Sequence, residues 1–219
     1  MGTPIEPAST LPADPEPTAR KPLGCLIELA ETLILTVVIF FVVQTFIAQP
    51  YQVQQQSMET TLLPDQNVLV DKLTPRFDAY SRGDIVVFNP VGRDDGCAAP
   101  ITSGGGPDAV PFIKRVIGEP GDTVSLQRGD VYVNGVVIDE PYVHDAPTMP
   151  ENGETEWTVP AEQIFVMGDN RQFSQDSRTF GPICTTDVIG RAFLRYWPLS
   201  EFGILPTPTY PDVPPAQGN

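Results

Sequence analysis

The sequence predicts a mainly β protein that carries a single N-terminal membrane-spanning helix. Three observations lead to this fold class. Residues 32–48 contain no charged side chain. Much of the remaining chain consists of short runs rich in Val, Ile, Phe and Tyr, separated by Gly, Pro, Asp and Asn, which is the pattern of strands and turns. No long segment with a period of 3.6 residues follows residue 49, so the region beyond the helix is expected to be all β.

Both ends of the chain are expected to lack regular structure. Residues 1–22 are rich in Pro, Ala, Thr and Glu and contain almost no large apolar side chains. Such a segment buries too little surface to offset the entropy lost on ordering, so we expect a disordered tail. Residues 206–219 are again rich in proline, and we expect a loose C-terminal tail there.

The apolar segment LIELAETLILTVVIFFVVQTFIA, residues 26–48, is predicted to cross a membrane within a helix over residues 23–48. Its helical length of roughly 35 Å is enough to span the hydrocarbon core. A buried core helix is disfavoured because the segment is apolar on all sides. A cleaved leader is disfavoured because bulky Phe46 would lie at −3 of a cut after Ala48. Arg20 and Lys21 precede the segment, which predicts a cytoplasmic N-terminus and an extracytoplasmic domain.

We expect the β domain to occupy residues 49–205. Its strands are predicted by the runs QNVLVDKL, GDIVVFNP, PFIKRVIG, DTVSLQ, DVYVNGVVI, QIFVMGD and GRAFLRYWPL. Asn134 and Gly135, between two apolar runs, predict a two-residue hairpin turn. Residues 93–111 predict a flexible insertion. Three glycines in this insertion suggest a phosphate-binding loop, but no Gly-Lys-Ser/Thr and no helix follow, so a linker is favoured.

Composition excludes several classes of function. The formal net charge is −15, which argues against a nucleic-acid partner, because nucleic acid requires a basic face. It also argues against broad electrostatic adhesion to anionic lipid. The three cysteines lack CxxC spacing, so we expect no metal and no other cofactor. Cys97 and Cys184 both lie on the oxidising side of the predicted membrane, but the sequence leaves their pairing open.

Ser57, in QQQSMETTLLPDQ, is a candidate nucleophile shortly after the apolar segment. A Ser-His-Asp triad would have to use His144, the single histidine, but its polar, proline-broken surroundings predict a solvated loop. A lysine base is the other solution. Lys114 lies among the apolar residues of PFIKRVIG, where desolvation would lower its pKa toward neutrality. A lysine that extends from an edge strand into water is an equal alternative at this point.

The stretch MGDNRQFSQDSRTFG follows a predicted strand directly and alternates acids with arginines. Such charges form either a fixed paired network or a solvated turn. A network would hold neighbouring loops in place, and the residues alone leave open which of the two arrangements Asp169, Arg171, Asp176 and Arg178 form.

Taken in order, QSMETTLLPDQ, RGDIVVF, FIKRVIGEPGD, VYVNGVVIDEPYV and GDNRQFSQDSRTFG resemble a bacterial type I signal peptidase. The resemblance covers roughly residues 49–197 and depends on the motifs in combination. It implies a membrane-anchored peptidase with an extracytoplasmic all-β catalytic domain, which removes signal peptides from exported preproteins. Ser57 matches the nucleophile, Lys114 the general base and Ser174 the serine that orients the lysine. The charged residues of the last motif match the structural network behind the site.

The chain departs from the family pattern around the nucleophile. The family usually has proline at the position of Thr60, so we expect a less rigid turn. It has small residues at the positions of Gln55 and Gln56. In an extended strand, the side chains at 53, 55 and 57 share one face. We therefore expect the Gln55 amide to join the Ser57 backbone N–H in binding the oxyanion.

The resemblance also implies how the substrate binds and which partners the enzyme has. A preprotein is expected to lie extended along strand edges and to be cut after small residues at −1 and −3, with pocket walls at Val53, Met58, Leu62 and Ile113. The expected partners are signal peptides and a lipid bilayer, and the enzyme is expected to be monomeric. Two alternatives stay open. One is a related peptidase dedicated to a single substrate, such as a conjugation or pilus factor. The other is a membrane-anchored β binding module without activity.

Overall fold

The computed structural model describes residues 22–42, 44, 47–73, 77, 79–89, 97, 110–143 and 147–216. Nearly all of the predicted N-terminal tail, most of the predicted insertion at residues 93–111, and His144 lie outside the described residues. The chain divides into two compact units, Met1–Phe41 and Val42–Asn219.

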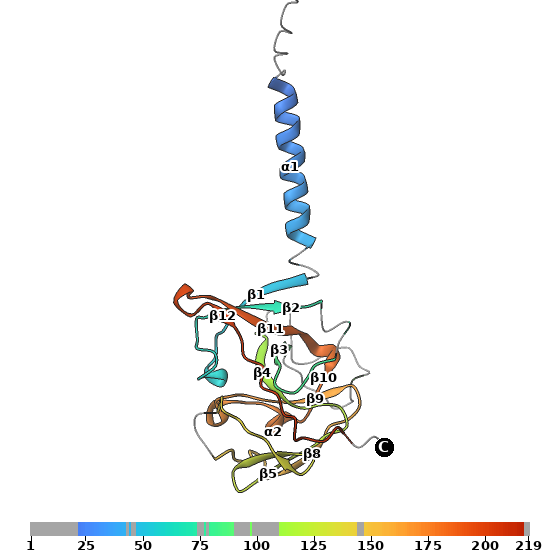
Figure 1. Cartoon of the computed structure of the whole chain (residues 1–219), viewed down its shortest axis with the longest axis vertical. Coiled ribbons are helices and arrows are strands. Elements are labelled where there is room, and N and C mark those ends of the chain that lie inside the picture. Colours follow the sequence, from blue (N-terminus) through green and yellow to red (C-terminus); the bar gives the residue numbers. More distant parts are fainter. Residues whose placement is uncertain are drawn as a thin grey trace, which may run out of the picture. The chain divides into compact units, whose positions relative to one another are not determined.

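One helix, α1 (Pro22–Val42), dominates the first unit (Figure 1). The large apolar side chains described along it are exposed. The hydroxyls of Thr32 and Thr36 bond to backbone carbonyls four residues earlier, so these polar groups are satisfied within the helix. Among the described residues, no helix reaches the length and hydropathy needed to cross a membrane. The α-helix ends at Val42, Gln44 and Ile47 are in π-helical conformation, and Ala48 begins a strand.

The second unit is mainly β, as the sequence predicts. Its described strands are β1 (Ala48–Gln52), β2 (Asn67–Asp71), β3 (Ile85–Phe88), β4 (Phe112–Gly118), β5 (Thr123–Gln127), β6 (Asp130–Val133), β7 (Val136–Val137), β8 (Glu156–Thr158), β9 (Gln163–Met167), β10 (Ile183–Cys184), β11 (Val188–Trp197) and β12 (Gly203–Ile204), with a short helix α2 (Ser177–Phe180). Each predicted run contains a strand. The predicted hairpin joins β6 to β7, with φ of 52° at Asn134 and 81° at Gly135, as its turn type requires.

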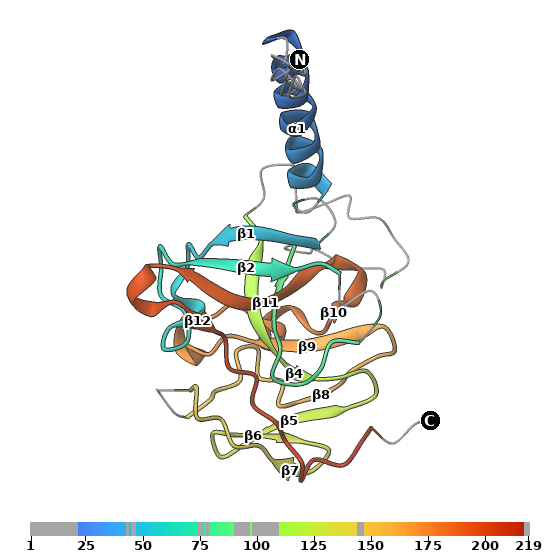
Figure 2. The same ribbon diagram turned by 45° about the horizontal axis from the view of Figure 1, so that its top comes forward.

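The strands form two sheets. The larger has eight strands in the order β1-β2-β11-β3-β4-β9-β10, with β12 paired to β11, and the smaller has four in the order β7-β6-β5-β8. The described strand pairs are antiparallel. Figures 1 and 2 show β1 and β2 at one end of this unit and the smaller sheet at the other. Strand β4 lies well inside the larger sheet, so side chains on it are shielded from water.

Three clusters of buried apolar side chains stabilise the second unit. One lies between the smaller sheet and β9 and includes Trp157 and Phe165. A second surrounds the segment after β1 and includes Val53, Met58 and Leu62. A third packs β3, β4, β9 and β10 together. The second cluster fixes the position of the segment that carries Ser57, because Val53 before Ser57 and Met58 and Leu62 after it are buried.

The C-terminal segment, residues 206–216, docks on this unit and is not loose as predicted. Tyr210 and Val213 pack against the cluster of the smaller sheet. The Pro214 carbonyl accepts a 3.0 Å hydrogen bond from Asn134 Nδ2. Proline restricts the unfolded segment, so docking loses less entropy than it would for an ordinary tail, and a few contacts suffice.

Cys97 and Cys184, whose pairing the sequence leaves open, form a disulfide with their Cα atoms 5.5 Å apart. Cys184 lies in β10, which is the edge strand of the larger sheet. The bond therefore joins this edge to a residue 87 positions earlier in the chain.

Candidate active site

Ser57 lies in a short 3-10 turn, Gln56–Met58, a few residues after β1. Backbone hydrogen bonds hold this region from two sides. Val53 bonds through its N–H to Gln66 and through its carbonyl to Asp65, and the Ser57 carbonyl accepts a 3.0 Å bond from the Asn170 N–H. Ser57 is 3% exposed, so its hydroxyl is held in place and largely shielded from water.

Gln55 precedes this turn, and the predicted strand through residue 57 is wrong. Strand β1 ends at Gln52, and Gln55 starts the 3-10 turn from an extended conformation. Side chains in a 3-10 turn do not alternate between two faces, so the argument that Gln55 and Ser57 share one face does not hold. The Gln55 side chain is exposed, and its part in binding an oxyanion stays a prediction.

Lys114 projects from β4, and its Nζ donates a 2.7 Å hydrogen bond to Ser57 Oγ. It also donates to the Ile113 carbonyl at 3.0 Å. The lysine is 1% exposed, which rules out a side chain extended into water. Desolvation lowers the pKa of Lys114 to about 8, although Asp176 and Asp169 act in the opposite direction. A buried nitrogen with this pKa, in contact with a hydroxyl, can act as a general base.

Asp176 and Arg178 form a buried ion pair behind the lysine. Two parallel bonds of 2.9 Å join the carboxylate to the guanidinium, and both residues are almost fully buried. Arg178 also donates to the backbone carbonyls of Arg171 and Ser174. The solvated-turn alternative therefore does not hold for this pair.

The other two predicted charges pair with residues outside their own loop. Asp169 receives bonds of 2.9 and 2.7 Å from Arg115, the residue after Lys114 on β4. Arg171 pairs with Glu140. Neither Arg115 nor Glu140 was predicted from the sequence to belong to this network. An arginine in an apolar strand needs a buried partner, so the position of Arg115 was a signal that it forms a buried ion pair.

Gly168 lies in close contact with both Ser174 and the Ser57 backbone. A Cβ on Gly168 would lie 2.2 Å from Ser174 Oγ and 2.5 Å from the Ser57 carbonyl oxygen, so only glycine fits. The Ser174 hydroxyl donates to Asp176 at 2.7 Å. In the part of the chain that the structure describes, no hydrogen bond joins Ser174 to Lys114, so its lysine-orienting role stays a prediction.

This arrangement of a buried serine and lysine accompanies a match to a known family. The family model described as "Signal peptidase, peptidase S26" matches residues 26–197, which is most of the chain. The chain belongs to the signal peptidase family. The predicted family and the predicted enzyme class, a serine peptidase, are thereby confirmed.

Individual signal peptidases resemble the chain over most of its length. The probable signal peptidase I-2 of Synechocystis sp. is 38% identical over 84% of this chain and 79% of that protein. The signal peptidase I of Leptolyngbya laminosa is 35% identical over 92% and 95% of the two chains. A crystal structure of a signal peptidase I from Enterococcus faecalis V583 is 29% identical, with a TM-score of 0.38, over 52% of this chain and 97% of that one.

Thr60, where the chain departs from the signal peptidase pattern, has a backbone conformation that proline cannot adopt. Its φ is 86°, which the proline ring cannot adopt and which is unusual for a β-branched residue. The Thr60 hydroxyl donates to the Tyr142 carbonyl at 2.5 Å. A side-chain hydrogen bond therefore restrains this turn where the family usually has proline, and the lower rigidity of the turn stays a prediction.

The predicted pocket residues divide into two groups. Val53 and Ile113 line a small cleft of about 30 Å³ together with Gln55. Met58 and Leu62 are fully buried in the core cluster beneath the nucleophile turn. The described cleft is therefore built by the residues just before Ser57 and just before Lys114.

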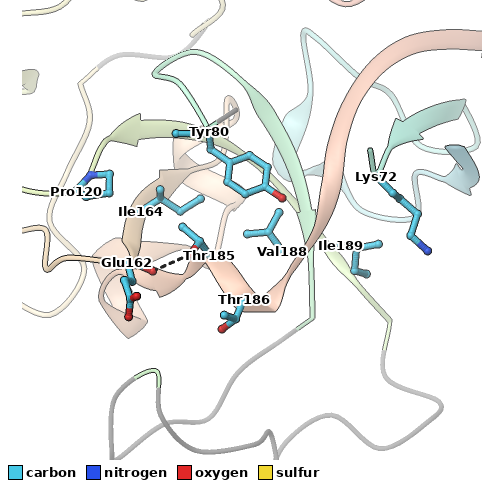
Figure 3. A pocket seen from close by; sticks show the side chains of 10 residues that line it. Lys72, Tyr80, Pro120, Glu162, Ile164, Thr185, Thr186, Val188 and Ile189 are labelled. Atoms are coloured by element: carbon cyan, nitrogen blue, oxygen red, sulfur yellow. Dashed lines mark hydrogen bonds between the residues drawn. The ribbon is translucent and has the colours of Figure 1, made fainter. Parts of the chain in front are cut away.

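A second cavity, of about 490 Å³, lies elsewhere in this unit (Figure 3). The ring of Tyr80 and the side chains of Ile164 and Val188 face it, with Lys72 and Glu162 at its margin. Among the described residues that line it there is no serine or cysteine. The cleft beside Ser57 is therefore the candidate active site, because Ser57 contacts a buried lysine there.

Replacing Asp176 with alanine should destabilise the enzyme by about 3–5 kcal/mol, because the change leaves the buried Arg178 without its main partner. The measurement is the midpoint of urea unfolding. Asp212→Ala, an exposed position, is the control and should leave the midpoint unchanged. Equal midpoints for the two variants would mean that the ion pair contributes nothing to stability.

Proposed function

We propose that this enzyme removes N-terminal signal peptides from exported preproteins, with Ser57 as nucleophile and Lys114 as general base. The observation that carries the proposal is the 2.7 Å contact between the buried Nζ and Oγ atoms. Neutral Lys114 takes the hydroxyl proton, and the alkoxide attacks the carbonyl carbon before the scissile bond. The lysine then gives this proton to the departing amine, which leaves an acyl-enzyme. Lys114 finally takes a proton from water, and the hydroxide attacks the ester carbonyl. The lysine then returns the proton to the departing Ser57 oxygen, which releases the signal peptide and regenerates the hydroxyl and the neutral lysine.

The lowered pKa of Lys114 makes this proton transfer feasible near neutral pH. With a pKa of about 8, about a tenth of the molecules carry a neutral lysine at pH 7, against fewer than about one in a thousand at an unperturbed pKa. The rate should therefore rise with pH until the pKa of Lys114 is passed. The site needs no metal and no other cofactor for these steps.

An open strand edge beside the two residues suits an extended substrate. Strand β4 pairs with β3 from Phe112 onward, whereas its described pairing with β9 begins only at Arg115. One side of the segment from Phe112 to Lys114 is therefore unpaired among the described strands. A preprotein that adds to this edge would place alternate side chains in the adjacent cleft.

The cleft also favours small side chains. Its volume of about 30 Å³ is about that of one water molecule in the liquid. We propose that Val53 and Ile113 accept an alanine-sized side chain at −3 or −1 and exclude larger ones, with Met58 and Leu62 as the apolar support beneath.

Gln55 is proposed as the second donor to the oxyanion, beside the Ser57 backbone N–H. Removing such a donor costs about a hundredfold to a thousandfold in kcat. Gln55→Ala should therefore lower kcat steeply with little change in KM, and Gln55→Ser should recover part of the loss. Gln56→Ala is the control. A Gln55→Ala enzyme within about threefold of the wild-type kcat would show that the amide is not a donor.

We also propose that residues 26–48 anchor the enzyme in a membrane, with the second unit on the extracytoplasmic side. The exposed apolar side chains of α1 and the basic Arg20 and Lys21 before it support this topology. The second unit has its own exposed apolar patch, formed by Trp197, Leu199, Phe202 and Ile204. Patches of this kind mark interaction surfaces, and tryptophan favours the membrane–water interface.

Fluorescence tests the contact of this patch with lipid. The only other tryptophan is Trp157, so a Trp157→Phe enzyme reports on Trp197 alone. Brominated zwitterionic lipid in nanodiscs should quench this emission. Because the net charge is −15, added anionic lipid should not strengthen the effect. Emission equal in brominated and ordinary lipid would exclude the contact.

The decisive experiment is cleavage of model preproteins by the detergent-solubilised full-length enzyme. We expect cleavage of several unrelated preproteins after small residues at −1 and −3, with products identified by mass spectrometry. Substituting a large residue at −1 should block cleavage. Cleavage of a single preprotein only would favour a dedicated peptidase, and no cleavage of any would reject the proposal.

A further inference from the structure

The C-terminal segment follows a defined path across the second unit. Figure 2 shows this segment, in red, running from β12 toward the smaller sheet. At its start the Leu205 N–H bonds to the Phe193 carbonyl at 2.9 Å. Further along, the Pro208 carbonyl oxygen lies only 2.5 Å from where a Cβ on Gly83 would be. The segment is thus in tight backbone contact with the domain before it reaches Tyr210.

Tyr210 connects the segment to Tyr142. The two phenol oxygens are 2.8 Å apart, and burial is the main cause that raises the pKa of each phenol. Both therefore stay neutral, and one hydroxyl donates to the other. The Tyr142 ring in turn covers the guanidinium of Arg115, whose central carbon lies 4.0 Å from the ring centroid.

Tyr142 and Arg115 each contact the nucleophile's surroundings. The Tyr142 carbonyl accepts the Thr60 hydroxyl, three residues after Ser57. Arg115 donates to the Pro206 carbonyl at 3.3 Å and follows Lys114 directly on β4. The C-terminal segment is therefore connected to the chain near Ser57 through Tyr142 and to the chain near Lys114 through Arg115.

Asp169 connects Arg115 to the segment that contacts the nucleophile turn. It receives two hydrogen bonds from Arg115 and one from the Thr61 hydroxyl. The next residue, Asn170, donates its N–H to the Ser57 carbonyl. The position of Arg115 therefore determines where Asp169 holds the segment that binds the nucleophile turn.

We propose that Tyr210 is a positioning residue of this enzyme, and that the docked C-terminal segment acts through Tyr142 and Arg115 to hold Ser57 and Lys114 in their reactive geometry. The proposal rests on the proposed function. Tyr210 touches neither Ser57 nor Lys114 in the described contacts, and its effect is exerted through the neighbouring residues. A displacement of about 1 Å at the reacting atoms is enough to cost about a hundredfold in rate.

Loss of the Tyr210 side chain should also change the acidity of Lys114 in one direction. The charged groups that act on Lys114 are Asp176 and Asp169, and both raise its pKa against the dominant effect of desolvation. A displaced Arg115 would neutralise Asp169 less well, and a loosened segment would admit water. Each change favours the protonated lysine, so the pKa of Lys114 should rise.

The test uses Tyr210→Ala and Tyr210→Phe in the full-length enzyme, with Thr209→Ala, an exposed neighbour in the same segment, as the control. Tyr210→Ala should lower kcat at least about tenfold while KM changes less than about twofold. The rise of rate with pH should move to higher pH. Tyr210→Phe keeps the packed ring but removes the hydroxyl that contacts Tyr142, so it should recover only part of the loss. Kinetics are measured well below each variant's unfolding temperature, so that a purely structural role would leave kcat and the pH profile unchanged.

A second readout does not depend on cleavage. The chain has three lysines, so NMR of 13C-labelled lysine, assigned with Lys114→Met, gives the pKa of Lys114 directly. This pKa should be higher in Tyr210→Ala than in the wild type and unchanged in Thr209→Ala. If the wild type fails to cleave preproteins, the proposed function fails and the NMR pKa alone decides the positioning role. A Tyr210→Ala enzyme that matches Thr209→Ala in kcat and in this pKa overturns the proposal.

Discussion

Replacing Lys114 with methionine should abolish cleavage, lowering kcat by more than about a thousandfold. Methionine fills a similar apolar volume but cannot accept the proton of the Ser57 hydroxyl, which lies 2.7 Å from Nζ. No other lysine, cysteine or histidine is described within hydrogen-bond reach of that hydroxyl. Ser57→Ala should lower the rate equally, and the double variant should be no worse than either single one, because the two residues act as a unit. The measurement is single-turnover cleavage of a model preprotein.

His144→Ala is the matched control and should retain nearly full activity. A large loss there, or a Lys114→Met enzyme with more than a few per cent of the wild-type rate, would reject the serine–lysine assignment. The buried lysine also predicts a pH-dependent stability. Its pKa in the folded enzyme, about 8, lies below the unfolded value of 10.5. The unfolded chain therefore binds more protons between these values, and the wild type gains stability as pH rises through that window.

The difference between the two pKa values of Lys114 also predicts which protein, wild type or Lys114→Met, is more stable at neutral pH. At pH 7 the lysine is mostly protonated in both states, so the folded enzyme bears the full cost of burying its charge. A lowering of about 2.5 pKa units corresponds to roughly 3 kcal/mol. Lys114→Met should therefore be the more stable protein at pH 7, and its advantage should shrink as the pH approaches 10.5. An advantage that is constant with pH would contradict a lysine buried in this way.

Gly168→Ala should have the second-largest effect, with kcat reduced at least about a hundredfold and stability lowered by about 1–3 kcal/mol. The added methyl group would lie 2.2 Å from Ser174 Oγ and 2.5 Å from the Ser57 carbonyl oxygen. The second contact is with backbone, which cannot turn aside as a side chain can. The nucleophile turn must therefore shift, which disturbs the contact between Ser57 and Lys114. Cleavage kinetics and the midpoint of urea unfolding measure the two effects.

Gly203→Ala is a suitable control for this variant. A Cβ there would meet nothing within 4 Å, and its backbone is not among the positive-φ glycines. It should leave both kcat and the unfolding midpoint unchanged. If Gly168→Ala behaves in the same way, the close approach of Ser174 and Ser57 is not needed for catalysis.

The sequence predicted most of the strands because their side chains are rich in β-branched and aromatic residues. It did not predict β1, which contains a proline, or β8, β10 and β12, which have only two or three residues. Runs this short carry no alternation to detect. Their existence depends on partners far away in the chain, such as β2 for β1.

In the site, too, features that depend on local sequence could be predicted, and features that depend on distant partners could not. Ser57 and Lys114 could be selected because few nucleophiles and bases were available in suitable surroundings. The partners of Asp169 and Arg171 could not, because Arg115 and Glu140 lie 54 and 31 residues away. The extended strand through residues 53–57 was mispredicted because a 3-10 turn interrupts it, and three glutamines in sequence give no local signal for such a turn. The docking of the C-terminal segment depends equally on distant side chains, chiefly Tyr142 and Asn134.

The Cys97–Cys184 bond bears on how the enzyme can be produced. A cross-link over 87 positions removes roughly 4–5 kcal/mol of freedom from the unfolded chain. In the described register, strand β10 pairs with β9 through two residues, Ile183 and Cys184. In a reducing cytosol this short strand would detach readily and expose the backbone of β9 as a template for another copy of the chain. Protein made without the disulfide should therefore form oligomers through this edge, and production in an oxidising compartment should keep it soluble.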